Sequence, residues 1–424
     1  MIEPKRLFEP SCADYDPNSM PVGRAREVIR AYLTPVTAIE RVHIRQALER
    51  VLAADIASPV DVPGHDNSAM DGYAARFADL APDRETTLTR VDESFAGKPS
   101  TATVGPGECV RIFTGGVMPP GADSVVIQER VHEDAAGVHV AAGALSKRGQ
   151  NRRFAGEDLK RGETVLRAGD PVHAAELGMI ASLGIGEVAV YRRLRVAFFS
   201  TGDELKSIGT PLAAGEIYDS NRYTLYGMLT RLNCEVIDMG VVRDVPEELE
   251  HAFVSASKTA DVVITSGGVS VGEADYVKKL LEKLGDVVFW KIAMKPGRPL
   301  AYGRIGGAHF FGLPGNPVSV MVTFYEFVQD ALAVLQGRRD VAPRPTFKVP
   351  LATPISKARG RTEFQRGILE SDGNGAYAVR TTGEQGSGIL SSMSRANCFI
   401  VLSADTGNCQ AGDLVEVQLL EGLI

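Results

Sequence analysis

The sequence predicts a multidomain α/β plus β protein, in which one α/β domain with a parallel-rich sheet is joined to β-rich parts. Three observations predict this fold class. Residues 194–335 alternate strand-like apolar runs with helical segments, which is typical of a parallel sheet. Residues 58–140 and 347–424 instead contain short β-type runs broken by Gly, Pro and Asp. The length of 424 residues exceeds one ordinary hydrophobic core, so we expect three or four domains.

Composition narrows the class of protein. Hydrophobic residues make up 44% and charged residues 23% of the chain, an ordinary globular balance. The formal net charge of −7 leaves no excess of basic side chains for phosphate backbones, so we expect no nucleic-acid partner. The five cysteines are scattered without a C-x-x-C pair, which argues against a zinc site or a disulfide framework. The first 20 residues hold no apolar run and other apolar stretches are strand-sized, so we expect a cytoplasmic protein with no membrane segment.

The first part of the chain is predicted to be helical on either side of a β-rich insert. Apolar residues at helical spacing predict helices over Val22–Leu33, Ile39–Ile56 and Val172–Leu183. We expect the segments before and after the insert to pack together as one elongated connecting domain. The predicted boundaries are 1–57 with 150–192 for the connecting domain, 58–149 for the insert, 193–342 for the α/β domain and 343–424 for a C-terminal β-barrel.

The α/β domain alternates strands with helices. Strands are expected at Leu194–Phe199, Cys234–Val242, Asp261–Thr265 and Gly307–Gly312. Helices are expected at Ser220–Leu232, Pro246–Ala256 and Val318–Leu335. This order is that of βαβ units on a parallel sheet. Beyond residue 347 the β-type runs favour a small barrel or sandwich with no helix.

The chemistry is predicted to centre on a glycine-rich turn that follows the strand at Asp261–Thr265. Ser266, Gly267, Gly268 and Ser270 lie in this turn. Paired glycines let the backbone approach a ligand, and amides at the next helix start suit an anion. A tight strand-to-helix turn is the plainer interpretation, but the hydroxyls and the acids that follow favour a phosphorylated ligand with a metal ion.

Three carboxylates are expected around one crevice. Glu204, Asp244 and Asp275 each follow a predicted strand, and the carboxyl ends of parallel strands lie on the same edge of a sheet. Oxygen ligands of this kind suit Mg²⁺, which often bridges substrate phosphates. One such acid alone is more often a helix cap or a solvated loop residue. The convergence of three favours a metal site.

Basic side chains are placed beside this crevice. Lys291, Ala293 and Lys295 would share one face if the segment is a single strand. The alternative is a solvated strand face. In the C-terminal domain, Arg366 and the hydroxyl of Ser387 could hold an oxyanion. The insert adds polar islands at residues 63–74, 111–116 and 149–158, which the pattern does not place near the crevice.

The motifs together resemble one family. The segments are PGHDNSAMDGYA, RIFTGG, GQNRRFAGEDL, FSTGDEL, IYDSNRY, SGGVSVGEADYVK, KPGRP, GLPGNPVS, EFQRG and QGSG. In this order they resemble the MoeA family of molybdopterin molybdenumtransferases, which includes the E domain of gephyrin. The resemblance covers the chain from about Val22 to its end.

The resemblance implies a fold, a reaction and partners. It implies four domains, among them a MogA-like α/β domain, and a homodimer whose cleft uses residues of both subunits. The implied reaction takes adenylyl-molybdopterin and molybdate, needs Mg²⁺, and yields molybdenum cofactor and AMP. Other proteins of molybdenum cofactor biosynthesis and molybdoenzyme acceptors are the expected partners. Molybdate and tungstate are not distinguished.

Site residues are carried over position by position. The important acids of the family fall at Asp71, Asp158, Glu204, Asp244 and Asp275. The implied substrate contacts are Thr114, Arg153, Lys291, Lys295, Pro314, Pro317, Arg366 and Ser387. The chain departs from the family at Arg152, where an apolar residue is usual, and this leaves open which of the two adjacent arginines acts.

Two other functions were weighed. One is a nucleotidyl transferase or hydrolase built on a MogA-like domain, such as a molybdopterin adenylyltransferase. The other is a non-catalytic molybdopterin-binding scaffold. Proteins of the first kind lack the insert and the barrel, and the retained acids and lysines argue against the second.

Overall fold

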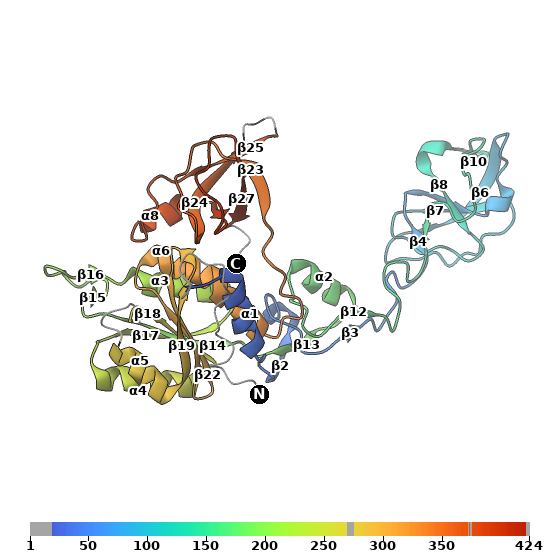
Figure 1. Cartoon of the computed structure of the whole chain (residues 1–424). Helices are drawn as coiled ribbons and strands as arrows, with labels where there is room; N and C mark the ends of the chain where they lie inside the picture. The colour runs from blue at the N-terminus through green and yellow to red at the C-terminus, as the bar shows by residue number, and fades with distance from the viewer. Residues whose placement is uncertain (1–18, 269–274, 372, 374, 421–424) are drawn as a thin grey trace.

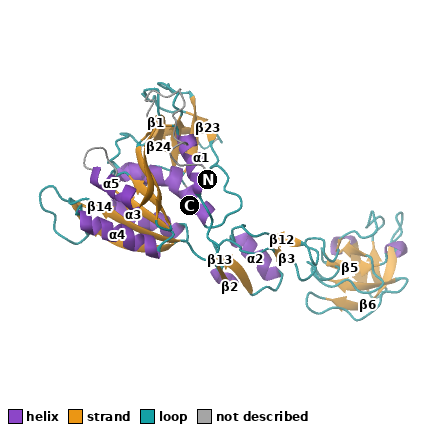
Figure 2. Ribbon diagram, turned by 60° about the horizontal axis from the view of Figure 1, so that its bottom comes forward, coloured by secondary structure: helices purple, strands orange, loops and turns teal. Residues whose placement is uncertain are grey.

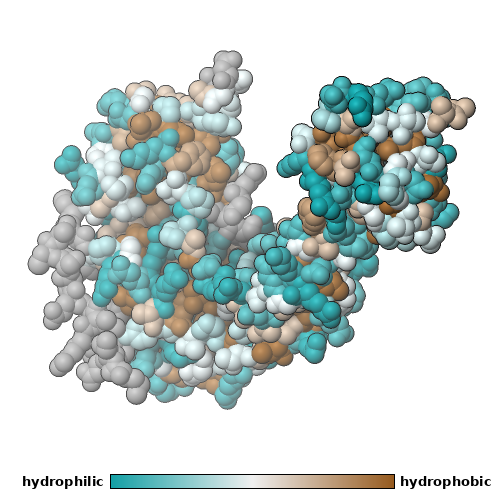
Figure 3. Space-filling view, turned by 90° about the vertical axis from the view of Figure 1, so that its right-hand side faces the viewer, coloured by the Kyte–Doolittle hydropathy of each residue, from teal (hydrophilic) through white to brown (hydrophobic). Residues whose placement is uncertain are grey.

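The computed structural model describes residues 19–268, 275–371, 373 and 375–420. The described part is elongated (Figure 1). The α/β domain and the C-terminal domain lie at one end, the connecting domain lies in the middle, and the insert lies at the other end. A second view shows the same order (Figure 2), and the space-filling view shows the insert as a separate body on a narrow neck (Figure 3).

The connecting domain is built from two separated segments. Strand β2 (Ile39–His43) pairs antiparallel with β13 (Glu187–Tyr191), and β3 (Ile56–Ala57) pairs antiparallel with β12 (Thr164–Leu166). Helix α2 (Ala174–Ser182) covers an apolar cluster that draws side chains from both segments. Pairing across more than 100 residues therefore holds this domain together.

The expected helix over Ile39–Ile56 is wrong. The segment forms β2, a 3₁₀ turn at Ile44–Gln46 and β3. The apolar spacing fits a helix, but a β-branched residue such as Val42 also suits a strand, and its partner Val188 lies far along the sequence. A local pattern cannot show such a partner.

The insert is a six-stranded sheet with the order β8-β5-β7-β6-β10-β9. The strands are β5 (Gly72–Ala75), β6 (Thr86–Ser94), β7 (Glu108–Ile112), β8 (Ser124–Ile127), β9 (Val131–Asp134) and β10 (Gly137–Val140). The pair β4 (Asn67–Ser68) and β11 (Arg152–Arg153) joins its two chain ends. The expected β-rich texture is thus confirmed for this region.

The α/β domain has a seven-stranded sheet with the order β1-β19-β21-β22-β18-β14-β17. Its strands are β1 (Ser19–Met20), β14 (Arg195–Thr201), β17 (Glu235–Val242), β18 (Val262–Ser266), β19 (Gly285–Ile292), β21 (Pro299–Ile305) and β22 (Ala308–Leu313). Strands β22, β18, β14 and β17 are parallel neighbours, while β19 and β21 are antiparallel additions. The sheet is therefore mixed, with the predicted parallel part at its centre.

Helices cover both faces of this sheet (Figure 1). They are α1 (Val22–Tyr32), α3 (Ser220–Arg231), α4 (Pro246–Thr259), α5 (Asp275–Leu284), α6 (Pro317–Thr323) and α7 (Gln329–Leu335). Side chains of α1, α3 and α6 share one apolar cluster with the sheet, and side chains of α4 belong to a second cluster. The sheet is thus sandwiched between two helical layers.

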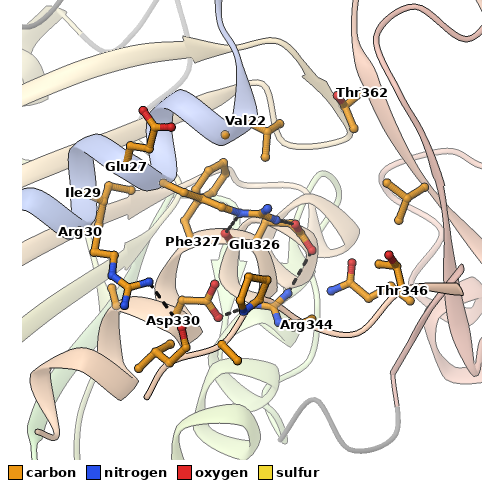
Figure 4. A pocket seen from close by; sticks show the side chains of 18 of the residues that line it. Val22, Glu27, Ile29, Arg30, Glu326, Phe327, Asp330, Arg344, Thr346 and Thr362 are labelled. Atoms are coloured by element: carbon orange, nitrogen blue, oxygen red, sulfur yellow. Dashed lines mark hydrogen bonds and ion pairs between the residues drawn. The ribbon is translucent and has the colours of Figure 1, made fainter. Parts of the chain in front are cut away.

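The helical stretch Pro317–Leu335 is long and apolar enough to cross a membrane, which corrects the expectation that apolar stretches are strand-sized. It is 72% buried inside the protein, as expected for the core helix of a folded domain. A π-helical turn, Phe324–Val328, interrupts it. In that turn the fully buried Glu326 pairs with Arg26 of α1 and, at 3.1 Å, with Arg344 (Figure 4). Arg344 lies in the linker, residues 336–346, that leads from the α/β domain to the C-terminal domain. Because both partners belong to other segments, this carboxylate ties α1 and the linker to the helix.

The C-terminal domain is a six-stranded sheet that recruits a strand from the α/β domain. Its strands are β20 (Met294–Lys295), β23 (Phe347–Pro350), β24 (Thr362–Ser371), β25 (Tyr377–Thr381), β26 (Cys398–Leu402) and β27 (Leu414–Leu419). One short helix, α8 (Leu390–Arg395), is present where none was expected. Its six residues leave too short a periodic pattern to recognise in the sequence.

The expectation that Lys291, Ala293 and Lys295 share one strand face is wrong. Lys291 belongs to β19 in the α/β sheet, whereas Lys295 belongs to β20, which pairs with β24. Ala293 is buried between them, and its carbonyl accepts a hydrogen bond from the Thr362 amide. The chain changes sheets at this point, so strand alternation does not continue through it.

Candidate functional site

A crevice of about 1010 Å³ lies at the carboxyl edge of the parallel strands. It is lined by loops that follow β14, β17, β18 and β22, by the start of α3, and by Gly388 and Leu390 of the C-terminal domain. Crevices at this edge of an α/β sheet are where such sheets bind ligands. The predicted site residues that line it are Glu204, Asp244, Ser266, Gly267, Gly268 and Pro317.

The glycine turn brings two strand ends into close approach. Gly267 has a φ of +92°, and a Cβ at this position would lie 2.5 Å from the carbonyl oxygen of Thr201. Only glycine fits both the left-handed backbone and the contact with β14. The turn therefore depends on glycine for packing as well as for ligand access. Ser270 lies outside the described residues.

Asn221 holds the floor of the crevice together, and sequence reasoning missed it. Its side-chain amide nitrogen donates hydrogen bonds of 2.7 Å to the Ser266 hydroxyl and 2.7 Å to the Gly315 carbonyl. Asp219 lies two residues earlier, where its carboxylate caps α3 by accepting from the Arg222 amide at 3.1 Å. The signal was present in the segment IYDSNRY, which the resemblance included without a role for any of its residues.

Buried oxygen atoms without a hydrogen-bond partner gather around the same crevice. Among the described residues they include Thr201 Oγ1, Asp219 Oδ2 and Asn221 Oδ1. A buried acceptor that no protein donor reaches is costly unless a ligand or water satisfies it. Together with nearby carboxylates, this set offers the hard oxygen donors that a Mg²⁺ ion takes.

Glu204 and Asp244 both line the crevice. The carboxylate of Glu204 folds over Gly202, where a Cβ would lie 2.5 Å from Oε2. The Asp244 amide donates to Asp203 at 3.4 Å, so a further acid stands beside the pair. The Asp275 side chain lies outside what the structure describes, and the described residues form no group of three metal-binding side chains. The three-carboxylate metal site therefore stays a prediction.

Arg366 is a buried cation of the C-terminal domain. It is 1% exposed, its Nε donates to Ser392 at 2.9 Å, and its terminal nitrogen donates to the Gly386 carbonyl at 3.0 Å. None of the ion pairs found among the described residues includes it. Burial lowers the pKa of the Arg366 guanidinium to about 10. A buried guanidinium without a carboxylate partner is a ready site for an oxyanion.

The loop that follows β25 reaches the α/β domain. The Ser387 carbonyl accepts from the Val318 amide at 3.1 Å, at the start of α6, and Gly388 lines the crevice. Pro317 occupies the first turn of α6, and Pro314 is buried between β22 and that helix. The predicted substrate residues of both domains thus meet around the start of α6.

The two lysines are not among the residues that line the crevice. The Gly297 backbone that follows Lys295 packs on α6, where a Cβ would lie 2.5 Å from Thr323 Oγ1. Lys295 contacts the buried Glu363 at 3.5 Å. Lys291 is exposed at the end of β19. The structure therefore packs the segment after Lys295 against α6 and leaves both lysines exposed to solvent.

The predicted residues of the insert form a separate cluster. Asp71 accepts hydrogen bonds from the Thr114 amide at 2.8 Å and the Thr114 hydroxyl at 2.9 Å, which lower the pKa of its carboxyl group. Arg152 pairs with Asp66, while Arg153 is exposed. Of the two arginines left open by the sequence, Arg153 is the one with a guanidinium available to a ligand.

The insert cluster does not reach the crevice of its own chain. Figures 1 and 2 place the insert at the opposite end of the molecule from the α/β domain. Asp71, Thr114, Arg153 and Asp158 are absent from the residues that line the crevice. One chain alone therefore does not bring the two groups of predicted residues together.

Three family models match the chain in succession. They are the MoeA N-terminal region (domains I and II) at residues 20–184, a probable molybdopterin binding domain at 197–334, and the MoeA C-terminal region (domain IV) at 348–420. The molybdopterin molybdenumtransferase of Haemophilus influenzae is 45% identical over 95% of this chain and 98% of its own length. The chain belongs to the MoeA family.

Other relatives agree. Gephyrin of Dictyostelium discoideum is 33% identical over 95% of this chain and 62% of its own length. The crystal structure of the molybdopterin biosynthesis moeA protein from Pyrococcus horikoshii superimposes with a TM-score of 0.81 at 30% identity, and covers 95% of this chain and 100% of its own. The family and multidomain fold predicted for this MoeA protein are confirmed. An isolated adenylyltransferase domain is not favoured, because the N-terminal and C-terminal MoeA regions are both present. A non-catalytic scaffold is not favoured either, because relatives at 45% and 36% identity are named molybdopterin molybdenumtransferases.

Proposed function

We propose that this protein inserts molybdenum from molybdate into adenylyl-molybdopterin and releases molybdenum cofactor and AMP. The observation that carries the proposal is the crevice, where a glycine turn and a helix start face the carboxylates of Glu204 and Asp244. Backbone amides suit phosphate and the carboxylates suit a divalent cation, so the crevice fits a phosphoanhydride with its metal. The names of the relatives support the same reaction.

Two groups of side chains have different proposed roles, one in metal binding and one in oxyanion binding. Glu204 and Asp244, with Asp275, would hold Mg²⁺, which would neutralise charge on the phosphoanhydride oxygens. Arg366 and Ser387, with Lys291 and Lys295, would bind and orient the tetrahedral oxyanion. Donors fixed before the oxyanion arrives lose no energy in reorganising, which favours residues held by two domains.

The homodimer is part of the proposal. Because the insert, which carries Asp71 and Thr114, lies at the opposite end of the molecule from the α/β domain (Figure 1), a second copy would have to supply them. Large apolar side chains are exposed on the segment 205–218, which forms the strands β15 (Leu205–Lys206) and β16 (Ile217–Tyr218) beside the crevice, and on α3. Such a surface is expected to be covered by a partner. The exposed side chains are Ile208, Leu212, Ile217, Tyr218, Tyr223 and Tyr226.

The reaction is tested by incubating the purified protein with adenylyl-molybdopterin, molybdate and Mg²⁺ and measuring AMP. We expect AMP release that needs all three additions. Formation of pyrophosphate from ATP and molybdopterin would instead support an adenylyltransferase. Binding of the adenylylated substrate without AMP release under any condition would support a scaffold. Chelation of divalent cations, followed by addition of Mg²⁺, tests the metal requirement.

The shared site is tested by mixing two inactive variants, Asp71→Asn and Glu204→Gln. A mixed dimer would pair one intact crevice with one intact insert, so subunit exchange should restore about a quarter of the wild-type AMP release. Two Glu204→Gln samples mixed together are the control and should stay inactive. No recovery after demonstrated subunit exchange would contradict a site built from both copies.

We also propose that the protein acts in the cytoplasm. Its proposed partners are other proteins of molybdenum cofactor biosynthesis and the molybdoenzymes that accept the cofactor. Each is what the family membership and the proposed reaction imply. Co-purification of a molybdoenzyme apoprotein with the loaded protein would test the acceptor.

A further inference from the structure

A buried carboxylate lies directly behind Lys295. Glu363 is 4% exposed, and its Oε1 lies 3.5 Å from the Lys295 ammonium nitrogen. Its other oxygen accepts a hydrogen bond of 2.8 Å from the Gln365 side-chain amide. A buried carboxylate needs a cation or several donors to offset its desolvation, and here one cation and one amide supply this.

The backbone fixes this contact. Strand β20 runs parallel to β24, with Lys295 opposite Glu363 in the register. Side chains of paired residues leave the same face of a sheet, so the register itself directs the two groups toward each other. The Thr362 amide also donates to Ala293 at 2.9 Å, which holds the start of β24 against the segment that leads into Lys295.

The side chains of Glu363 and Lys295 differ in conformational freedom. Glu363 is immobilised inside the C-terminal domain, whereas half of the Lys295 side chain remains exposed. A lysine ammonium group carries three N–H donors, and the contact with Glu363 uses one of them. The other donors remain available to a ligand. A free lysine loses rotamer entropy when it binds an anion, and a fixed carboxylate behind the ammonium group reduces that loss.

We infer that Glu363 is a positioning residue for oxyanion binding, which acts by holding the Lys295 ammonium group in place. The inference rests on the oxyanion role proposed for Lys295. Glu363 does not touch the oxyanion, since it is buried and negatively charged. Its effect should therefore appear in molybdate binding and should vanish when Lys295 is removed.

The test is a double-mutant cycle on the full-length protein. Molybdate binding is measured by calorimetry, and AMP release is measured over a range of molybdate concentrations, for Glu363→Gln, Lys295→Ala and the double variant. Glu363→Gln should weaken molybdate binding about tenfold, with turnover at saturating molybdate changed less than about threefold. In the Lys295→Ala background the same substitution should have no further effect on binding.

Two further variants serve as controls. Glu370→Gln lies on the same strand and removes an exposed carboxylate that pairs with Arg380 at 2.7 Å, so molybdate binding should not change. Glu363→Asp keeps the charge with a shorter side chain and should recover part of the affinity. If Glu363→Gln does not fold, Glu363→Asp replaces it in the test. A folded Glu363→Asp protein should still bind molybdate more weakly than the wild type, because its shorter side chain holds the Lys295 ammonium group less well.

Three outcomes would overturn the inference. One is a Glu363→Gln effect of equal size with and without Lys295. Another is a fall in turnover or melting temperature with unchanged molybdate affinity, which would mark Glu363 as purely structural. If Lys295→Ala binds molybdate as tightly as the wild type, the proposed role of Lys295 itself fails. AMP release by the wild type remains a separate test of the overall reaction.

Discussion

The polar side chains of the insert and those around the crevice differ in whether they already have hydrogen-bond partners. In the insert two acid side chains already have partners, since Asp71 accepts hydrogen bonds from Thr114 and Asp66 pairs with Arg152. Around the crevice, buried oxygens of Asp219 and Asn221 have no partner among the described residues. In the C-terminal domain, Arg366 forms none of the ion pairs found in the described part of the chain. The insert is thus arranged in advance, whereas the crevice leaves hydrogen-bonding capacity that a ligand would fill. The residues that bind should therefore be those that cost stability.

The largest effect should come from Arg366→Met. Loss of the guanidinium should lower AMP release at least about 100-fold, because the oxyanion loses its buried cation. The same change removes a buried charge whose pKa is depressed by burial, so the melting temperature should stay equal or rise. Activity and thermal unfolding are measured on the same preparation. A melting temperature that falls by many degrees would show that Arg366 is a structural group.

The next largest effect should be a difference in how the stability of the α/β domain and that of the insert respond to acidic pH. Burial lowers the pKa of His309, on β22, to about 4, while an unfolded histidine titrates near 6.5. The unfolded state therefore takes up the proton first, and the free energy of unfolding should fall by about 3 kcal/mol as the pH drops from 6.5 to 4. In the insert, the lowered pKa of the Asp71 carboxyl group contributes stability that is lost only when the pH falls below its unfolded value of 3.8.

Hydrogen exchange resolved by region would measure this difference. Between pH 6.5 and 4 the α/β domain should lose protection while the insert keeps it. His309→Gln should flatten the pH dependence of the α/β domain. Simultaneous loss of protection in both regions would contradict the comparison.

Asn221→Ala should have an intermediate effect. It removes the two hydrogen bonds that tie Ser266 and Gly315 together, so the floor of the crevice should loosen. We expect the KM for adenylyl-molybdopterin to rise about tenfold and stability to fall by about 1–2 kcal/mol. Steady-state kinetics and chemical denaturation measure both. An unchanged KM would mean that the crevice floor does not contact the substrate.

The smallest effect should come from Arg152→Gln. Its pair with Asp66 is partly exposed, so its loss should cost about 1 kcal/mol in the insert and little activity. Arg153→Gln should do the reverse, with lower AMP release and unchanged stability, because Arg153 is exposed. If Arg152→Gln is the variant that loses activity, the assignment of the two arginines is reversed.

Local patterns predicted a large part of the fold. The four parallel strands β14, β17, β18 and β22 and the helices α3, α4 and α6 with α7 were recognised because each buries apolar residues whose pattern is visible in its own sequence. The antiparallel strands β19 and β21 were not among the expected strands. The glycine turn at Gly267 was recognised because a positive φ restricts the choice of residue. The expected helix at Ile39–Ile56 failed because the deciding partner lies in β13, about 145 residues away.

The sequence by itself determined the family, the order of the domains and the types of residue at the site. These are encoded in motifs that each occupy a few consecutive positions. Only the tertiary structure decided which groups meet: Asn221 with Ser266, Lys295 with Glu363, and the loop at Ser387 with the start of α6. It also decided that the Asp71 cluster stands apart from the crevice (Figure 1). Contacts of this kind join residues far apart in the chain, and no local pattern records which distant residue a side chain will touch.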